Sequence, residues 1–136
     1  MNEIQPILLA EDDQVDIMTV KRSFKKLGVL NELIIVNDGE QALQYLRHPD
    51  KGLPCVILLD INMPKMNGHE CLKHLKAHQV FKNIPVVMLT SSKERQDVDR
   101  CFDLGISGYI LKPVEYEKFI DAVQVLKPYW TLREQT

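Results

Sequence analysis

The chain has 136 residues, which is enough for one domain with a sizeable core but too few for a core plus a separate effector. Its 45% hydrophobic and 26% charged residues are typical of a globular protein, and its net charge of −2 gives no basic field for nucleic acid or anionic membrane. No apolar stretch approaches the roughly 20 residues that span a bilayer, and residues 1–5 do not resemble the start of a signal peptide.

Three cysteines are widely spaced in apolar patterns: Cys55, Cys71 and Cys101. An odd number of such residues does not suggest a disulfide framework or a metal site. They are therefore predicted to be reduced thiols in the core of a cytoplasmic protein.

Short apolar runs alternate with amphipathic stretches along the chain. In chain order the pattern predicts a strand at 6–10, a helix at 14–27, a strand at 33–36, a helix at 40–47, a strand at 55–59, a helix at 68–78, a strand at 85–89, a helix at 93–104, a strand at 109–111 and a helix at 115–127. Residues 128–136 are expected to be a short C-terminal extension, because Pro128 should disturb the last helix. No internal repeat or linker is found, so a single domain over 1–136 is predicted.

Strict alternation of strand and helix predicts an α/β fold, with a doubly wound parallel sheet of five strands and helices on both faces. The predicted strands are continuous apolar runs, which is typical of strands buried on both sides. In such a sheet the ligand site lies beyond the carboxyl ends of the strands. The residues that follow the strands are therefore the candidates for chemistry.

Chemically active side chains follow four of these strands. Glu11 and Asp12 follow the first strand, Asp60 the third, Thr90 the fourth and Lys112 the fifth. Carboxylates gathered at one edge repel one another unless cations neutralise them, and Lys112 supplies one. A hard divalent ion is the natural second cation, and Mg²⁺ favours one or two carboxylates together with water and phosphate oxygens.

This set of side chains suits phosphoryl transfer. As an ionised carboxylate, Asp60 can attack phosphorus and form an acyl phosphate without a separate general base. Glu11 and Asp12 would hold Mg²⁺, while Lys112 and Thr90 would bind the phosphoryl oxygens.

Four segments resemble those of the response-regulator receiver domain, and they occur in the same order. They are ILLAEDD at 7–13, DINMPKMNG at 60–68, LTS at 89–91 and GYILKP at 108–113. Each motif alone is weakly specific, but the four together, each in the right strand context, are very specific. The resemblance extends over the whole chain and implies a flavodoxin-like sheet with strand order 2-1-3-4-5.

The resemblance implies that Asp60 accepts a phosphoryl group from the phosphohistidine of a histidine kinase. It also implies that Mg²⁺ is bound by Asp12, Asp60 and the backbone carbonyl of Asn62, with Glu11 holding a metal-bound water. Glu11 is a mild departure, since aspartate is frequent there.

The resemblance further implies a conformational switch and no enzymatic turnover. Thr90 would move to the phosphoryl group, and Tyr109 would turn inward behind it, which changes the protein-binding surface. Apart from its own phosphoryl transfer and slow autodephosphorylation, the chain would catalyse nothing. A cis peptide bond before Pro113 is usual in the family.

Three segments lengthen the chain beyond a minimal receiver: 50–54, 81–85 and 127–130. In these segments the chain is similar to the small stand-alone regulators that pair with bacterial and cyanobacterial phytochrome kinases. The implied partner is a phytochrome-type histidine kinase. No DNA-binding module is found, so output is expected through protein contact or phosphate relay.

Two surface features leave alternatives open. A basic face of the helix at 14–27 is either simply solvated or docks an acidic kinase surface; it comprises Lys21, Arg22, Lys25 and Lys26. Tyr129 and Trp130 either fold back on the domain or form a homodimer contact through the last helix and tail.

Other polar residues are interpreted as solvated. Asp13 and Asp16 are acids beside a strand end, where solvated loops commonly carry them. His74 and His78 are four residues apart and could pair on a metal, but no acidic third ligand stands at a suitable offset.

Two competing functions remain. The first is a protein-interaction module with a receiver fold that works independently of phosphorylation. The second is a phosphatase with an aspartate nucleophile, which would carry a second aspartate two residues after the first to protonate the leaving group. That position is Asn62, which argues against the phosphatase.

Overall fold

The computed structural model describes residues 4–91 and 95–130, with side chains at all of these except 95–98 and 125–130. Its strands are β1 (Ile7–Ala10), β2 (Leu33–Val36), β3 (Val56–Asp60), β4 (Val86–Thr90) and β5 (Gly108–Leu111). Its helices are α1 (Gln14–Lys26), α2 (Gly39–Arg47), α3 (Gly68–Ala77), α4 (Arg95–Asp103) and α5 (Tyr116–Trp130), with a short 3-10 helix, η1 (Phe81–Asn83), before β4. None of the helices in the described ranges is long and apolar enough to cross a membrane.

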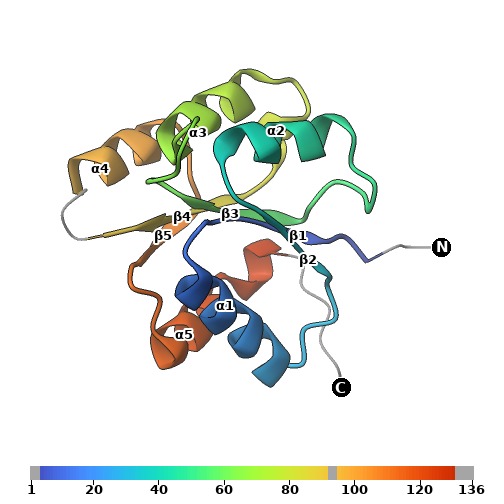
Figure 1. Cartoon of the computed structure of the whole chain (residues 1–136), viewed down its shortest axis with the longest axis vertical. Helices are drawn as coiled ribbons and strands as arrows, with labels where there is room; N and C mark the ends of the chain where they lie inside the picture. Colours follow the sequence, from blue (N-terminus) through green and yellow to red (C-terminus); the bar gives the residue numbers. More distant parts are fainter. Residues whose placement is uncertain (1–3, 92–94, 131–136) are drawn as a thin grey trace.

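The strands form one parallel sheet in the order β2-β1-β3-β4-β5 (Figure 1). This confirms the predicted doubly wound, flavodoxin-like fold. The chain runs from β1 to the β2 edge and then crosses back to β3, so the direction of winding reverses between β1 and β3. The carboxyl ends of these two strands therefore flank the expected ligand site.

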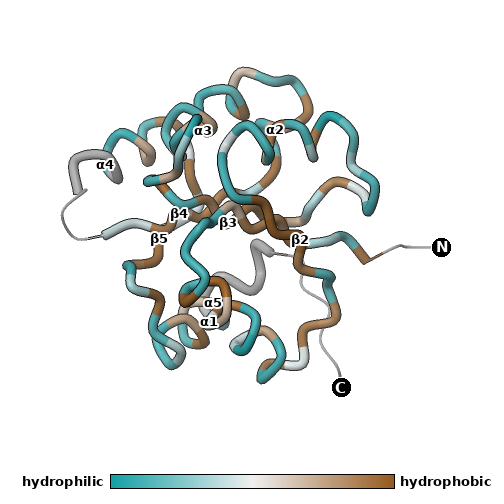
Figure 2. The backbone as a smooth tube through the Cα atoms, viewed as in Figure 1, coloured by the Kyte–Doolittle hydropathy of each residue, from teal (hydrophilic) through white to brown (hydrophobic). Residues whose placement is uncertain are grey.

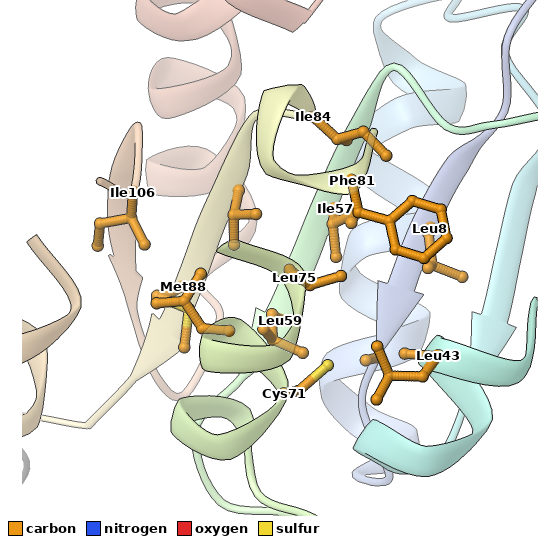
Figure 3. Close-up of a cluster of buried hydrophobic side chains, with 14 of the residues drawn as sticks. Leu8, Leu43, Ile57, Leu59, Cys71, Leu75, Phe81, Ile84, Met88 and Ile106 are labelled. Atoms are coloured by element: carbon orange, nitrogen blue, oxygen red, sulfur yellow. The ribbon is translucent and has the colours of Figure 1, made fainter. Parts of the chain in front are cut away.

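Helices α2, α3 and α4 cover one face of the sheet, and α1 and α5 cover the other (Figure 1). Successive strand residues point to opposite faces, so each strand contributes to two separate cores. Leu8, Ile57 and Met88 belong to the core that includes residues of α2 and α3 (Figure 3), whereas Leu9 and Leu58 belong to the core against α1 and α5. Because both faces are buried, hydrophobic colour runs through the centre of the sheet (Figure 2).

The predicted elements agree with the observed ones to within two residues, except at the last helix. Helix α5 continues to Trp130, so the prediction that it ends before Pro128 is wrong. Proline lacks the backbone N–H that would donate a hydrogen bond within the helix. Pro128 lies in the last turn of α5, so its effect is confined to the end of the helix. The η1 turn before β4 was not predicted.

Side-chain caps determine where the helices beside the carboxyl edge of the sheet begin. Oδ1 of Asp13 accepts the backbone N–H groups of Val15 and Asp16 at 2.9 and 3.2 Å, and Oδ1 of Asn67 accepts that of Glu70 at 2.9 Å. These caps satisfy N–H groups of the first helical turn that have no partner within the helix. Asp13 is thus a structural cap of α1, which agrees with a role outside the chemistry.

Candidate functional site

The register of the sheet places Glu11 beside Asp60. Ala10 of β1 pairs with Leu59 of β3, so the residues that follow them lie abreast at the carboxyl edge. Both acids are buried, with exposed fractions of 0% for Glu11 and 1% for Asp60. Two buried carboxylates side by side require a cation.

Lys112 supplies a cation directly after β5. Its Nζ lies 3.0 Å from Oδ2 of Asp60, 3.0 Å from each carboxylate oxygen of Glu11 and 3.4 Å from Oδ2 of Asp16. The peptide bond between Lys112 and Pro113 is cis, as the resemblance implied. One ammonium group therefore joins carboxylates from three different parts of the chain.

Asp16 belongs to this site, although its sequence context predicted a solvated acid. Its side chain is only 4% exposed, and its two oxygens are directed at different partners. Oδ2 faces Lys112, and Oδ1 accepts the backbone N–H of Val114 at 2.9 Å. A signal was available, because Asp16 lies one helical turn before Val20 on the buried face of α1.

Asp12 and Asn62 complete the acidic edge. One oxygen from each of Glu11, Asp12 and Asp60 lies within 4.8 Å of the other two, and Asp12 is exposed. The backbone N–H of Asn62 donates to Oδ1 of Asp60 at 3.2 Å. Among the described side chains, Oε2 of buried Glu11 receives no directed hydrogen bond, although Nζ of Lys112 is 3.0 Å away. Hard oxygen donors with unused acceptor capacity fit a small divalent cation.

Burial is the main cause that raises the pKa values of the two carboxyls at the site. Burial raises the pKa of Glu11 to about 7, and the negative charge of Asp60 also raises it. The hydrogen bond from the backbone N–H of Asp13 lowers this pKa but does not outweigh burial. Burial also raises the pKa of Asp60, and the contacts with Lys112 oppose it. Burial alone would lower the pKa of Lys112, but its contacts with Asp60 and Glu11 outweigh that and raise it. The acids therefore stay costly to ionise beside Lys112, and a nearby divalent cation would favour their ionised forms.

The predicted switch residues lie on β4 and β5. Thr90 is buried and follows Leu89, which pairs with Asp60. Tyr109 is 48% exposed, and its ring packs edge to face against Phe102 of α4 with centroids 5.9 Å apart. Thr90 is thus at the site and Tyr109 is turned outward, while their coupled movement stays a prediction.

Gly68 allows the segment after Asp60 to return closely to the end of β3. Its backbone N–H donates to the carbonyl of Ile61 at 2.8 Å. A Cβ atom at position 68 would overlap the carbonyl oxygen of Asp60 and crowd the backbone of Ile61. Glycine is therefore required for α3 to begin this near to the phosphorylation candidate.

His78 has a local structural role at the end of α3. It lies just past the end of α3, where its Nδ1 accepts the backbone N–H groups of Val80 and Phe81 at 3.1 and 3.3 Å. Its ring also stacks on that of Phe81, with centroids 3.7 Å apart. The imidazole therefore caps the η1 turn.

The fold and the acidic site together define a signalling receiver. Residues 7–124 match the family described as the response regulator receiver domain. The chain belongs to this family, which acts in two-component phosphorelay signalling with histidine kinases as partners.

Relatives of the chain have regulatory names. The chain is 37% identical over 127 residues to the probable methanogenesis regulatory protein FilR2 of Methanothrix harundinacea, covering 91% of this chain and 82% of that protein. It is 34% identical over 133 residues to the response regulator Rcp1 of Synechocystis, covering 95% of this chain and 90% of that one.

Solved structures of regulators share the fold. The bacteriophytochrome response regulator RtBRR is 43% identical, with a TM-score of 0.80 over 90% of this chain and 78% of that one. The Mn(2+)-bound form of Rcp1 also has a TM-score of 0.80, over 97% of this chain and 99% of that one, at 33% identity.

Proposed function

We propose that the chain is a response regulator that stores a phosphoryl group on Asp60 and then changes its protein-binding surface. The observation that carries this proposal is the ion pair between buried Asp60 and Lys112 at 3.0 Å, beside Glu11 and the exposed Asp12. A carboxylate held by an ammonium group at the edge of a parallel sheet is suited to attack phosphorus. The chain would catalyse only its own phosphorylation and slow dephosphorylation.

The transfer forms a bond between an oxygen of Asp60 and phosphorus, and it breaks the P–N bond of a kinase phosphohistidine. The electron pair of the broken bond remains on the imidazole nitrogen, so Asp60 needs no general base. Lys112 and Thr90 would donate to the phosphoryl oxygens and stabilise the charge that develops there.

We propose Mg²⁺ as the divalent ion of the site. The ligands would come from Glu11, Asp12, Asp60 and the backbone carbonyl of Asn62, with Glu11 acting through water. When bound, the ion would neutralise the carboxylates and the phosphoryl oxygens. This assignment is supported by the clustered acids, by the oxygen Oε2 of Glu11 that accepts no hydrogen bond among the described residues, and by the Mn(2+) ion named for Rcp1.

Stabilisation by Mg²⁺ should increase with pH. The raised pKa of Glu11 means that the metal-free fold is favoured at low pH, where this carboxyl is protonated, and that this advantage is lost as pH rises through about 7. Mg²⁺ must displace that proton, so it should stabilise by about 1–3 kcal/mol at about pH 8 but much less at about pH 5.5. Thermal unfolding with and without Mg²⁺ at each pH measures this stabilisation. Titrations that Mg²⁺ does not affect contribute equally to both measurements and cancel in the difference. Glu11→Gln should reduce the pH dependence, and equal stabilisation at both pH values would contradict the prediction.

Acetyl phosphate provides the direct test of the function. With Mg²⁺, intact-mass analysis should show one added phosphoryl group, which peptide mapping assigns to Asp60. Asp60→Asn should lose the adduct, because an amide is not a nucleophile toward phosphorus, and a chelator should suppress it in the wild type. No adduct on the wild-type protein, or an undiminished adduct on Asp60→Asn, would contradict the mechanism.

We propose a phytochrome-type histidine kinase as the upstream partner. The names of RtBRR and of the phosphorylated cyanobacterial phytochrome response regulator RcpA support this, the latter 32% identical with a TM-score of 0.81 over 93% of this chain and 94% of that one. The basic face of α1 is exposed and available for docking, although the guanidinium of Arg22 also lies 4.5 Å over the ring of Tyr116. We also propose a cytoplasmic location, which the three buried free thiols of Cys55, Cys71 and Cys101 support, because the cytoplasm keeps thiols reduced.

We further propose that phosphorylation acts through Thr90 and Tyr109 on the face formed by α4, β5 and α5. Exposed apolar side chains on this face are Phe102, Tyr109 and Leu111. A homodimer contact through α5 and the tail would adjoin it, but the side chains of Tyr129 and Trp130 lie outside those that the structure describes. Light scattering of the protein before and after phosphorylation measures any change in association.

A further inference from the structure

The placement of Asp16 points to a role in the phosphorylation cycle. Its carboxylate is 4% exposed, lies on the first turn of α1 and contacts the Lys112 ammonium group. An acid buried to this extent requires polar partners, and it has two: Nζ of Lys112 at 3.4 Å and the backbone N–H of Val114 at 2.9 Å.

Three carboxylates already surround the ammonium group of Lys112. An ammonium group carries three N–H donors. Glu11, Asp60 and Asp16 already lie around Nζ, the first two at 3.0 Å and the third at 3.4 Å. Hydrogen bonds to Oε1 of Glu11 and Oδ2 of Asp60 use two of the donors. A phosphoryl oxygen would therefore compete for the third with Asp16, the most distant of the three carboxylates.

Asp16 is held in place independently of Lys112. The hydrogen bond from Val114 fixes Oδ1, and the cap at Asp13 accepts the backbone N–H of Asp16 itself at 3.2 Å. Two contacts of Asp16 thus do not involve the ammonium group, and one of them anchors it to the loop after Lys112.

We propose that Asp16 is a positioning residue that holds Lys112 in the unphosphorylated protein and must release it when Asp60 is phosphorylated. The inference rests on the proposed function of Asp60. Asp16 acts through Lys112 and opposes phosphorylation, both by competing for the ammonium group and by adding negative charge beside the incoming phosphoryl oxygens. Removing the negative charge of Asp16 therefore favours the phosphorylated state.

Beryllofluoride is the probe for this competition, because it is a stable tetrahedral mimic of a phosphoryl group on a carboxylate. Its dissociation constant in the presence of Mg²⁺ is measured by fluorine NMR for the wild type and for Asp16→Asn. Asparagine keeps an oxygen for the N–H of Val114 but removes the charge. We expect Asp16→Asn to bind beryllofluoride about three- to tenfold more tightly than the wild type.

Asp13→Asn is the matched control. It removes the same charge three residues away on the same helix, keeps the cap because asparagine is an equally good N-cap, and lies at an exposed position. Its affinity for beryllofluoride should stay within about twofold of the wild type, since exposed charges are screened. Equal affinities of Asp16→Asn and the wild type, or an equal change in Asp13→Asn, would overturn the inference.

A crystal structure of the wild-type beryllofluoride complex tests the same point without a variant. Nζ of Lys112 should contact a fluorine atom and leave Oδ2 of Asp16, while Oδ1 keeps the N–H of Val114. Retention of the 3.4 Å contact beside a bound beryllofluoride would overturn the inference. Failure of the wild type to bind beryllofluoride would instead overturn the assignment of Asp60, and the inference with it.

Discussion

Replacing Lys112 with methionine should be the most damaging single substitution of a charged residue at the site. Methionine keeps most of the apolar stem but leaves buried Glu11, Asp16 and Asp60 without their shared cation. We expect a loss of about 3–5 kcal/mol in the free energy of unfolding at neutral pH without metal, because a broken buried ion pair leaves charge uncompensated. Urea denaturation measures it.

The loss should also depend on conditions in a way that a packing defect would not. It should be smaller at low pH, where the carboxyls bind protons, and smaller again when Asp60→Asn is added to Lys112→Met. Lys118→Met is the control, because that lysine is 77% exposed and pairs at 3.3 Å with Glu115, which precedes α5. It should change stability by about 0.5 kcal/mol or less, and an equal loss in both variants would refute the buried-cation explanation.

Replacing Gly68 with alanine should have the second large effect. The added Cβ overlaps the carbonyl oxygen of Asp60, and a backbone atom cannot move away as a flexible side chain can. We expect a loss of about 2–4 kcal/mol in the free energy of unfolding, together with slower phosphorylation because the end of β3 must shift. Chemical denaturation and the rate of acetyl phosphate labelling provide the two measurements.

The backbone conformation of Gly68 makes this prediction sharper. Gly68 is the first residue of α3 and is not among the glycines with positive φ, so Gly68→Ala would stabilise the protein by about 0.4–1 kcal/mol if the space were open. Lys73→Ala, at an exposed position of the same helix, should stay within about 0.5 kcal/mol of the wild type. A Gly68→Ala protein as stable as the wild type would show that the close approach to Asp60 is not required.

Much of the fold could be predicted because the signals are local. Apolar runs and helical spacing depend on neighbours in sequence, and they placed most elements within two residues of the observed bounds. Pro128 misled the prediction of the last helix, because the rule that proline ends a helix is weaker in the final turn.

The part of the candidate site that could be predicted consists of residues at the carboxyl ends of parallel strands, because these ends meet at one edge of the sheet. Glu11, Asp60 and Lys112 lie together for this reason. The role of Asp16 in the site was not predicted, because an acid on the first turn of a helix more often faces solvent. The role of His78 was not predicted either, because the residue was interpreted as solvated, whereas its Nδ1 accepts two backbone N–H groups of the turn after α3.

The sequence by itself determined the fold class, the order of the motifs and the residue types that can carry out phosphoryl transfer. The tertiary structure alone decided how these residues share charge. Lys112 contacts Glu11 across 101 residues of chain and Asp60 across 52, and Asp16 accepts the N–H of Val114 across 98. Periodicity describes which face of an element is buried, whereas a pKa or an ion pair depends on atoms that only folding brings within a few ångströms.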